Sequence, residues 1–216
     1  RSSAMSGPWD YRRQSALYQR AVLPSLKVFG RALFLLLGPI RAEGVSLVPR
    51  TGPLLLVSNH LADVDPPVLQ IACPRPIHFM AKSELFEIRL LGPLIRRLGA
   101  FPVRRGEPDR TSLRHALRLL AEGECVGLFP EGELSQDGSL LPLKPGLALL
   151  ARQSGAPVLC ARVDGTQRVL PYGSVVPRPS LRAVRVRFHE PRAFDLRTPA
   201  EEVLEWVRER LAPAGS

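Results

Sequence analysis

From residue 45 onward, short apolar runs alternate with segments of helical pattern, and this alternation constrains the fold more than any other feature. The strand-like runs are rich in Leu, Val and Ala, and they are Pro53–Ser58, Ile77–Ala81, Ala100–Val103, Cys125–Phe129, Pro157–Val163 and Ala183–Phe188. The helical segments are Pro66–Ala72, Leu85–Leu98, Arg110–Ala121, Pro145–Gln153 and Pro199–Leu211. The pattern predicts an α/β domain with a mostly parallel central sheet, covered by helices on both faces.

The first 44 residues have a different character and carry an excess of basic side chains. In a helical projection, one side of residues 11–40 is cationic and the opposite side is apolar. The cationic side comprises Arg13, Arg20, Lys27 and Arg31, and the apolar side comprises Tyr18, Val22, Leu26, Phe29, Leu33 and Leu36. Because Pro24 interrupts the pattern, we expect an N-terminal amphipathic helical hairpin.

Amphipathic helices of this kind can lie in a bilayer interface. The sequence therefore predicts that the chain has two parts. Residues 1–44 would form a membrane-association segment, and residues 45–216 would form the α/β domain. No apolar stretch reaches the ~20 residues needed to cross a bilayer. The alternative is that the amphipathic helix only covers the core of the domain.

The overall charge narrows the choice of partners. Thirty Lys and Arg against 20 Asp and Glu give a formal net charge of +10. This excess indicates an anionic partner: nucleic acid, a phosphorylated substrate or an acidic bilayer surface. Three scattered cysteines, Cys73, Cys125 and Cys160, exclude a disulfide scaffold and a Cys/His zinc cluster, and they fit a reducing compartment.

A candidate base stands where the first strand-like run ends, at Asn59-His60, with Asp65 five residues beyond the histidine. On a continuous helix this spacing would separate imidazole and carboxylate by about 140°. Across a strand-to-helix loop the chain can double back, which would bring the carboxylate to the ring and fix its tautomer. The structural alternative is that Asp65 caps a helix beginning at Pro66 and that His60 only closes a turn.

Polar groups follow two further strand-like runs. Arg104 and Arg105 offer forked, permanently charged donors that suit a phosphate. Glu131, Gly132 and Ser135 stand at the carboxyl end of another strand, which is where ligands bind in open α/β sheets. The alternatives are a solvated strand end for the arginines and a surface turn for the second group.

The order and spacing of these groups resemble the lysophospholipid acyltransferase family, specifically its 1-acylglycerol-3-phosphate acyltransferases. Asn59-His60 with Asp65 matches the family's catalytic Asn-His-x-x-x-x-Asp motif. The other matching positions are Gly99, Val103 and Arg105, then Phe129-Pro130-Glu131-Gly132 with Ser135, then Ala156-Pro157-Val158, and also Lys82–Leu85 and Lys144–Gly146. The resemblance spans roughly residues 45–165. Arg104 stands where many members carry an acidic or neutral residue, so it is open which guanidinium holds the phosphate.

The resemblance implies transfer of a fatty acyl group to the sn-2 hydroxyl of lysophosphatidic acid, which gives phosphatidic acid. The co-substrate is a thioester of coenzyme A or acyl carrier protein, and neither a cofactor nor a metal is implied. His60 would be the general base and Asp65 its orienting partner, because an alcohol is too weakly acidic to attack unaided. The substrate-binding residues it implies are Asn59, Lys82, Gly99, Arg104, Arg105, Glu131, Gly132, Ser135 and Lys144.

The same reading explains the charge, since lysophosphatidic acid, the acyl donor and the bilayer surface are all anionic. The expected localisation is peripheral, or monotopic, on the cytoplasmic face of a membrane. The alternatives are another superfamily acceptor, such as glycerol-3-phosphate, a different lysolipid or a lipid-A-type molecule, and more distantly a basic nucleic-acid-binding protein. Nucleic acid is not the expected partner, because aromatic residues make up only 6% and no stacking platform is visible. A serine hydrolase lacks its Gly-x-Ser-x-Gly elbow.

Overall fold

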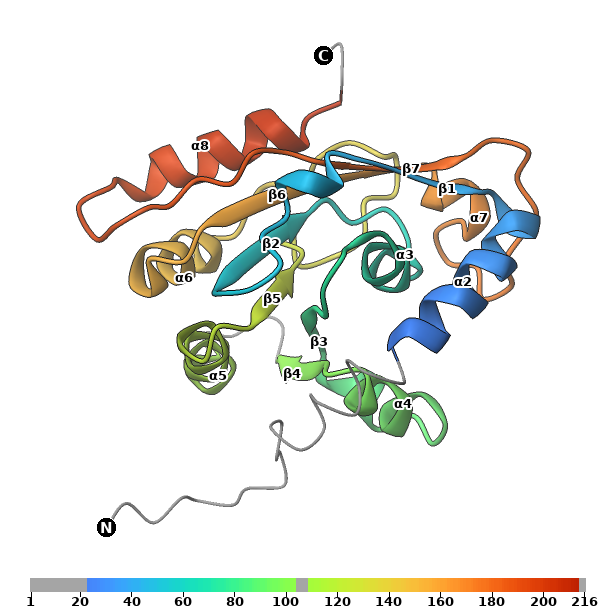
Figure 1. Ribbon diagram of the computed structural model, residues 1–216, viewed down its shortest axis with the longest axis horizontal. Helices are drawn as coiled ribbons and strands as arrows, with labels where there is room; N and C mark the ends of the chain where they lie inside the picture. Colours follow the sequence, from blue (N-terminus) through green and yellow to red (C-terminus); the bar gives the residue numbers. More distant parts are fainter. Residues whose placement is uncertain (1–22, 104–108, 214–216) are drawn as a thin grey trace.

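The computed structural model describes residues 23–103 and 109–213, which form one seven-stranded sheet flanked by helices (Figure 1). The strands are β1 (Ile40–Glu43), β2 (Leu54–Ser58), β3 (His78–Lys82), β4 (Phe101–Val103), β5 (Cys125–Leu128), β6 (Val158–Asp164) and β7 (Val184–Phe188). The α-helices are α2 (Leu23–Leu37), α3 (Asp65–Ala72), α4 (Leu91–Arg97), α5 (Arg110–Ala121), α6 (Gly146–Ser154), α7 (Thr166–Val169) and α8 (Ala200–Leu211). Two short 3-10 helices are η2 (Val45–Leu47) and η3 (Ser83–Phe86).

The sheet has the order β1-β7-β6-β2-β5-β3-β4. Five neighbouring strands, from β6 to β4, run parallel to one another, and β7 runs antiparallel to β6 with β1 parallel to β7. The predicted α/β fold with a mostly parallel sheet is therefore confirmed.

Strand β2 lies at the centre of the core, because every one of its five side chains is buried. Leu55 and Val57 contact the cluster formed with α5, α6 and α8 on one face. Leu54 and Leu56 contact the cluster formed with α2 and α3 on the other face. Since successive strand residues point to opposite faces, a continuous apolar run is what a strand covered on both sides requires.

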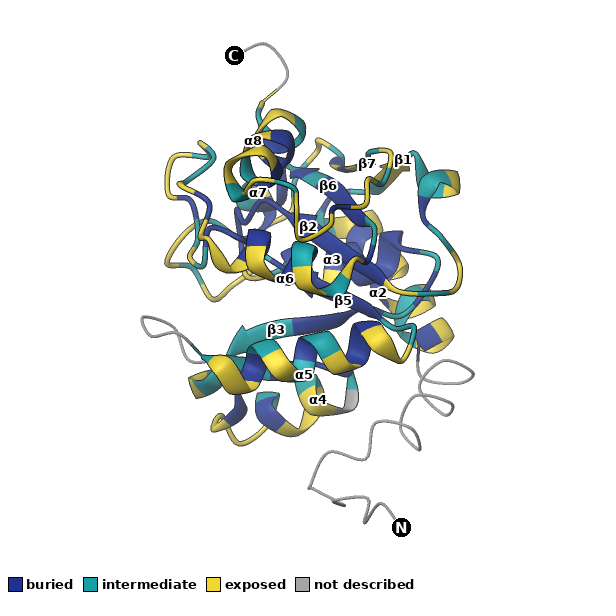
Figure 2. Cartoon of the chain, turned by 90° about the vertical axis from the view of Figure 1, so that its left-hand side faces the viewer, coloured by how far each residue is buried: buried dark blue, intermediate teal, exposed yellow. Residues whose placement is uncertain are grey.

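Helices cover both faces, and each turns an apolar side inward. Figure 2 shows α5 and α6 with buried inner and exposed outer residues. Helix α5 begins where the side chain of Asp109 accepts hydrogen bonds from the backbone N–H groups of Thr111 and Ser112, a standard N-cap. Helix α6 ends at Gly155, whose φ of 60° is the left-handed conformation that stops a helix.

Two elements differ from the sequence expectation. The segment Leu85–Leu98 was expected to be one helix, but it divides into η3 and α4. Pro93 lacks an N–H and fits only the first turn of a helix, which is why α4 begins at Leu91. Strand β1 was not expected at all, and it pairs with β7, so the sheet begins before the boundary drawn at residue 45.

The N-terminal hairpin is described only in its second half. The first expected helix lies outside the described residues, and the second is α2, which begins one residue before Pro24. Helix α2 contacts the domain through Leu23, Gly30 and Phe34, which are buried. Gly30 approaches α3 so closely that an added Cβ would lie 2.4 Å from Ile71 Cδ1.

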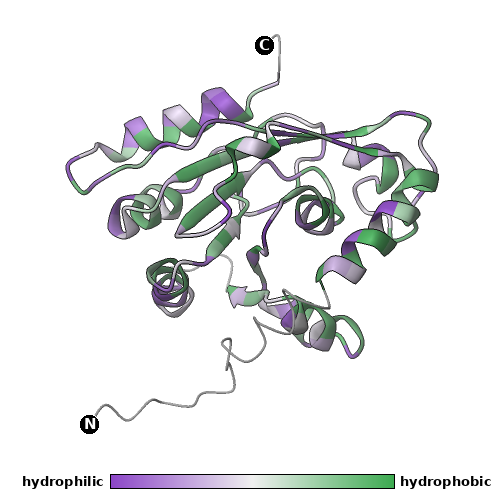
Figure 3. Ribbon diagram, viewed as in Figure 1, coloured by the Kyte–Doolittle hydropathy of each residue, from purple (hydrophilic) through white to green (hydrophobic). Residues whose placement is uncertain are grey.

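The apolar side expected for α2 does not cover the core. Phe29 and Leu36 are 68% and 75% exposed, and Leu33 is 43% exposed. Lys27, expected on the solvated cationic side, is instead half-buried and donates to the backbone carbonyl of Cys73, and this burial lowers the pKa of Lys27. Figure 3 shows hydrophobic residues over much of α2, interrupted by hydrophilic ones. Among the described helices, none is long and apolar enough to span a membrane.

Candidate active site

The candidate residues gather at the edge of the sheet where the parallel strands end. His60 follows β2, Lys82 ends β3, β4 ends at Val103, and Phe129 follows β5. Parallel strands bring their carboxyl ends to the same edge, so segments far apart in the chain meet there.

His60 is held against Asp65 in a buried loop. The Nδ1 atom of His60 lies 2.9 Å from Oδ2 of Asp65. The same Oδ2 atom accepts hydrogen bonds from the backbone N–H groups of Leu61, at 2.6 Å, and Ala62, at 2.9 Å. Three donors on one oxygen fix the carboxylate, and the carboxylate in turn fixes the ring, so that Nδ1 carries the proton.

This arrangement decides between the two interpretations of Asp65. Helix α3 begins at Asp65 itself, Val64 occupies the N-cap position, and no side chain caps the helix. The side chain of Asp65 turns back to His60 instead of capping the helix. Its second oxygen, Oδ1, is buried without a hydrogen-bond partner among the described residues.

The segment after β5 contacts His60 at three points. The Oε1 atom of Glu131 accepts a hydrogen bond from the backbone N–H of His60 at 2.8 Å. The backbone N–H of Ser135 donates to the carbonyl oxygen of His60, also at 2.8 Å. The ring of Phe129 stacks on the imidazole, with 4.0 Å between ring centroids and 17° between planes. Both the backbone and the ring of His60 are therefore fixed by this segment.

The carboxylate of Glu131 is fully occupied by the protein. Its side chain is 1% exposed, and its second oxygen, Oε2, accepts from the backbone N–H of Leu141 at 2.8 Å. Burial raises the pKa of Glu131, and the N–H groups of Leu141 and His60 act in the opposite direction. Glu131 thus links the loop that contains His60 to the loop that contains Leu141.

Asn59 and Ser135 are also engaged within the protein. The Nδ2 atom of Asn59 donates to the carbonyl oxygen of Val163 and its Oδ1 atom accepts from the N–H of Val163, both at 2.8 Å. This pair ties the end of β2 to β6. The Oγ atom of Ser135 donates to Asp137 at 3.2 Å and accepts from the N–H of Gly138 at 3.0 Å, which closes a turn.

Gly132 and Lys144 lie against each other beside this loop. Gly132 has a φ of 74°, and an added Cβ would lie 2.6 Å from Nζ of Lys144. The backbone N–H of Lys144 donates to the carbonyl of Pro130 at 2.9 Å. The positive φ favours glycine at this position, and the lysine side chain lies across it. Lys144 is exposed, so its ammonium group adds a solvent-accessible positive charge close to Glu131.

The remaining predicted residues are distributed unevenly. Lys82 lies at the same edge as His60, and its ammonium group is 3.2 Å from a carboxylate oxygen of Glu84. Arg104 and Arg105 follow the end of β4 directly but lie outside the described residues.

Gly99 precedes β4 and so lies at the opposite edge of the sheet from His60, which argues against a direct substrate contact. Its carbonyl is 3.0 Å from Nδ1 of His78, and its added Cβ would lie 2.7 Å from the same atom. Gly99 therefore allows the backbone to pack closely against the ring of His78.

Sequence reasoning assigned no role to Phe129, Val163 and Leu141. Phe129 was visible in the motif, but nothing in its spacing indicates stacking on a histidine 69 positions earlier. Val163 and Leu141 contribute only backbone groups, which residue type does not reveal. Within residues 23–103 and 109–213, no group of three or more His, Cys, Asp or Glu side chains could hold a metal ion.

Comparisons with known proteins place the chain beside one family. Residues 39–164 match the family model described as Acyltransferase. The 1-acyl-sn-glycerol-3-phosphate acyltransferase of Bacillus subtilis (strain 168) is 32% identical over 136 residues, which cover 62% of this chain and 67% of that protein. The chloroplastic enzyme BAT2 of Brassica napus is 31% identical over 135 residues, which cover 61% of this chain and 39% of that protein.

A solved structure is similar as well. The crystal structure of the 1-acyl-sn-glycerophosphate (LPA) acyltransferase PlsC from Thermotoga maritima matches with a TM-score of 0.77 and 29% identity, covering 88% of this chain and 76% of that one. The match to this chain spans about two thirds of the Bacillus relative and about two fifths of the Brassica relative. The family model covers more than half of the chain, including the His60 loop and the Glu131 segment, and the chain therefore belongs to the acyltransferase family.

Proposed function

We propose that this protein transfers a fatty acyl group from a thioester to the sn-2 hydroxyl of lysophosphatidic acid, forming phosphatidic acid. The observation that carries the proposal is the buried His60–Asp65 pair, with Nδ1 and Oδ2 only 2.9 Å apart. Because Nδ1 of His60 donates a hydrogen bond to Asp65, the other ring nitrogen, Nε2, can act as the proton acceptor. Within the described residues, no hydrogen bond engages Nε2.

The reaction follows from this geometry. Nε2 of His60 takes the hydroxyl proton as the acceptor oxygen attacks the thioester carbonyl carbon, and Asp65 stabilises the imidazolium that forms. The new C–O bond forms, the C–S bond breaks, and the proton on Nε2 passes to the departing thiolate. A thiol has a pKa of ~8.5, so the thiolate leaves without further assistance. The thioester is one of coenzyme A or acyl carrier protein.

The acceptor is recognised by its phosphate. β4 ends at the edge where β2 ends, and Arg104 and Arg105 come next in the sequence. Guanidinium groups bind phosphate through paired donors, so we assign them to the phosphate. Lys144 and Lys82 add positive charge at the same edge. The relatives from Bacillus and Brassica are named for a 1-acyl-sn-glycerol-3-phosphate acceptor, which supports this choice over glycerol-3-phosphate or another lysolipid.

Glu131, Ser135 and Asn59 act in this proposal as positioning residues. Both oxygens of Glu131 accept from backbone N–H groups, and the amide of Asn59 is paired with Val163. Neither side chain has a free polar atom to offer a substrate. Their role is to hold the His60 backbone at the end of β2, where a displacement would move the base from the acceptor hydroxyl.

The N-terminal segment, residues 1–44, is proposed to associate with the cytoplasmic face of a membrane as a peripheral element. The exposed side chains of Phe29 and Leu36 support this, because an apolar helix face turned to water is costly unless it is covered. Lysophosphatidic acid and its product carry acyl chains, so the enzyme must act at a lipid surface.

The test is thiol release from an acyl thioester by the purified protein, with and without lysophosphatidic acid. We expect release that depends on the acceptor, and we expect His60→Gln to abolish it while the protein stays folded at 25 °C. Glycerol-3-phosphate and lysophosphatidylcholine serve as alternative acceptors, and faster release with either would reassign the substrate. Release that is independent of every acceptor would indicate a thioesterase and contradict acyl transfer.

A further inference from the structure

The loop between α7 and β7, residues 170–183, exposes apolar side chains to an unusual degree. Val175 is 91% exposed and Leu181 fully exposed, while Tyr172 and Val176 are each more than half exposed. Isolated exposed apolar residues are common, but four within ten positions form a patch that calls for a partner.

Backbone hydrogen bonds hold this loop in place. The N–H of Arg178 donates to the carbonyl of Val169 at 2.7 Å, and the N–H of Ser180 donates to the carbonyl of Leu37 at 2.8 Å. Pro177 and Pro179 flank Arg178 and restrict the backbone further. The exposed side chains are therefore presented from a fixed segment.

The bond to Leu37 joins this loop to the end of α2. Just beyond that helix, an added Cβ on Gly38 would lie 3.0 Å from the carbonyl oxygen of Arg182, so the two segments are in direct contact. Helix α2 exposes its own apolar residues, including Val28 at 71% and Leu35 at 72%. The two segments adjoin where α2 ends, and we call them together the α2–loop surface (residues 23–37 and 170–183).

The charge around this surface has one sign. Residues 170–183 carry Arg178 and Arg182 and no acidic residue, and residues 23–37 carry Lys27 and Arg31 and no acidic residue. The neighbouring Arg187 of β7 is ion-paired with Glu43. Arg178 and Arg182 are exposed within the loop itself. Exposed apolar side chains among arginines are complementary to an anionic bilayer, which supplies both headgroup charge and hydrocarbon.

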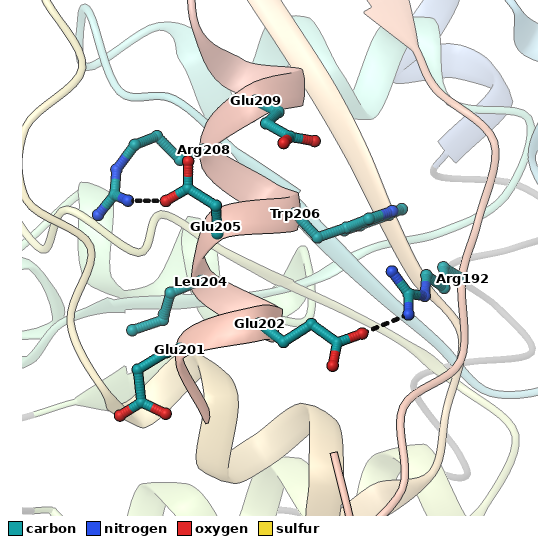
Figure 4. A pocket seen from close by; sticks show the side chains of 8 residues that line it. All are labelled: Arg192, Glu201, Glu202, Leu204, Glu205, Trp206, Arg208 and Glu209. Carbon is teal, nitrogen blue, oxygen red and sulfur yellow. Dashed lines mark hydrogen bonds and ion pairs between the residues drawn. The ribbon is translucent and has the colours of Figure 1, made fainter. Parts of the chain in front are cut away.

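The opposite end of the molecule has the opposite character. Figure 1 shows α2 and the loop after α7 at one end, and α8 with the loop before it at the other. A surface pocket of about 610 Å³ lies along α8, and Figure 4 shows that four glutamates line it, namely Glu201, Glu202, Glu205 and Glu209. Three of them are ion-paired, Glu202 with Arg192, Glu205 with Arg208 and Glu209 with Arg210. This face lacks the excess of positive charge found on the α2–loop surface, so an anionic bilayer attracts it less, and the asymmetry gives the molecule a preferred orientation.

We propose that the loop of residues 170–183 is a second membrane-docking element, which binds an anionic bilayer together with α2 while α8 faces the aqueous side. The proposal rests on the membrane association proposed above for the N-terminal segment, and it adds a contact about 150 residues further along the chain. Helix α2 lies against α3, the helix that begins with Asp65, so docking through this surface also restrains the element that carries the partner of His60.

Two matched variants test the proposal. Leu181→Ser/Arg182→Gln removes one apolar and one basic side chain from the loop. Leu196→Ser/Arg197→Gln removes the same pair of residue types from the exposed segment before α8. Within the described part of the chain, the hydrogen bonds of these four residues use only their backbone atoms, so neither variant removes one of them.

The measurement is flotation of the full chain with vesicles of phosphatidylcholine and 30 mol% phosphatidylglycerol, compared with pure phosphatidylcholine. This anionic lipid content gives the vesicles a negative surface potential. We expect the loop variant to bind anionic vesicles about tenfold or more weakly, since one arginine near such a surface is worth about fivefold. The α8-side variant should bind like the wild type.

Equal binding by the loop variant and the wild type would overturn the proposal, as would equal binding of the wild type to neutral and anionic vesicles. A loop variant that loses self-association in size-exclusion chromatography, while vesicle binding is unchanged, would assign the surface to a second copy and also overturn it. Acyl transfer in detergent micelles separates the two hypotheses. Transfer without vesicle binding refutes docking alone, whereas vesicle binding without transfer refutes the proposed enzyme function alone.

Discussion

Substitution of Glu131 by Gln separates a residue that positions the base from one that binds substrate. In the structure, Oε1 accepts from the N–H of His60 and Oε2 accepts from the N–H of Leu141, each at 2.8 Å. A glutamine side chain offers one acceptor oxygen, and its amide nitrogen can only donate. In either orientation of the amide, one buried backbone N–H therefore loses its acceptor.

The size of the effect follows from these contacts. An unsatisfied buried donor costs about 1–3 kcal/mol. Burial raises the pKa of Glu131, which means that the ionised carboxylate is itself disfavoured by its surroundings, and a neutral amide removes that part of the cost. We therefore expect the free energy of unfolding to fall by about 1–2 kcal/mol, which leaves the protein folded at 25 °C.

The kinetic consequence is specific to positioning. Because Glu131 holds the backbone of His60, its loss displaces the base, and kcat is expected to fall about 10- to 100-fold. The KM for lysophosphatidic acid should change by less than about twofold, because no oxygen of Glu131 is free to contact the acceptor. Thiol release at saturating acyl thioester, with the acceptor varied, measures both constants.

Glu133→Gln is the matched control, because Glu133 lies two residues further on and is exposed. It should leave both constants and the unfolding midpoint unchanged. A large rise in the acceptor KM of Glu131→Gln with kcat unchanged would refute the reasoning, since it would mean that Glu131 binds the acceptor directly.

Three further substitutions test the scaffold. Asn59→Ala leaves the buried N–H and carbonyl of Val163 unpaired, so urea denaturation should show a loss of about 2–4 kcal/mol. Gly44→Ala forces a side chain onto a residue with a φ of 68° and sets its Cβ 2.3 Å from the carbonyl oxygen of Phe188, so the melting temperature should fall by several degrees. Burial lowers the pKa of His115 to about 4, so the unfolded chain binds more protons below pH 6.5. Stability should therefore decline as the pH falls from about 6.5 to 4, and His115→Gln should flatten that part of the profile measured by urea titration.

The strands and helices that bury a continuous apolar face could be predicted from the sequence. Helix α5 has the expected bounds, β2 and β5 differ from expectation by one residue at one end, and β6 is shifted by one residue at both ends. These elements are specified locally, by residue type and spacing. Strand β1 could not be predicted, because Ile40–Glu43 contains few apolar residues and becomes a strand by pairing with β7, more than 140 positions away.

The residues of the site could be predicted from the sequence, but most of their contacts could not. The spacing of His60 and Asp65 allowed the carboxylate to meet the ring, and the structure brings them together. Glu131 and Ser135 were assigned to the substrate because they stand at the correct edge of the sheet. The side chain of Glu131 instead accepts from the backbone N–H groups of His60 and Leu141, and Ser135 meets the His60 carbonyl through its own backbone N–H. Residue types do not reveal such backbone contacts.

The orientation of α2 shows the same limit. The helical projection separates an apolar side from a cationic one, but it cannot tell which residues will face the domain. Gly30 decides this, because the absence of a side chain there lets α2 approach Ile71 of α3 closely. The helix therefore packs through a narrow strip and leaves Phe29 and Leu36 in solvent.

The most direct test of the central claim is mass spectrometry of the lipids formed by the purified protein from lysophosphatidic acid and an acyl thioester. The account predicts phosphatidic acid in a one-to-one ratio with released thiol for the wild type, and neither product above background for His60→Gln. Free fatty acid in place of phosphatidic acid, or undiminished phosphatidic acid from the His60→Gln protein, would contradict it.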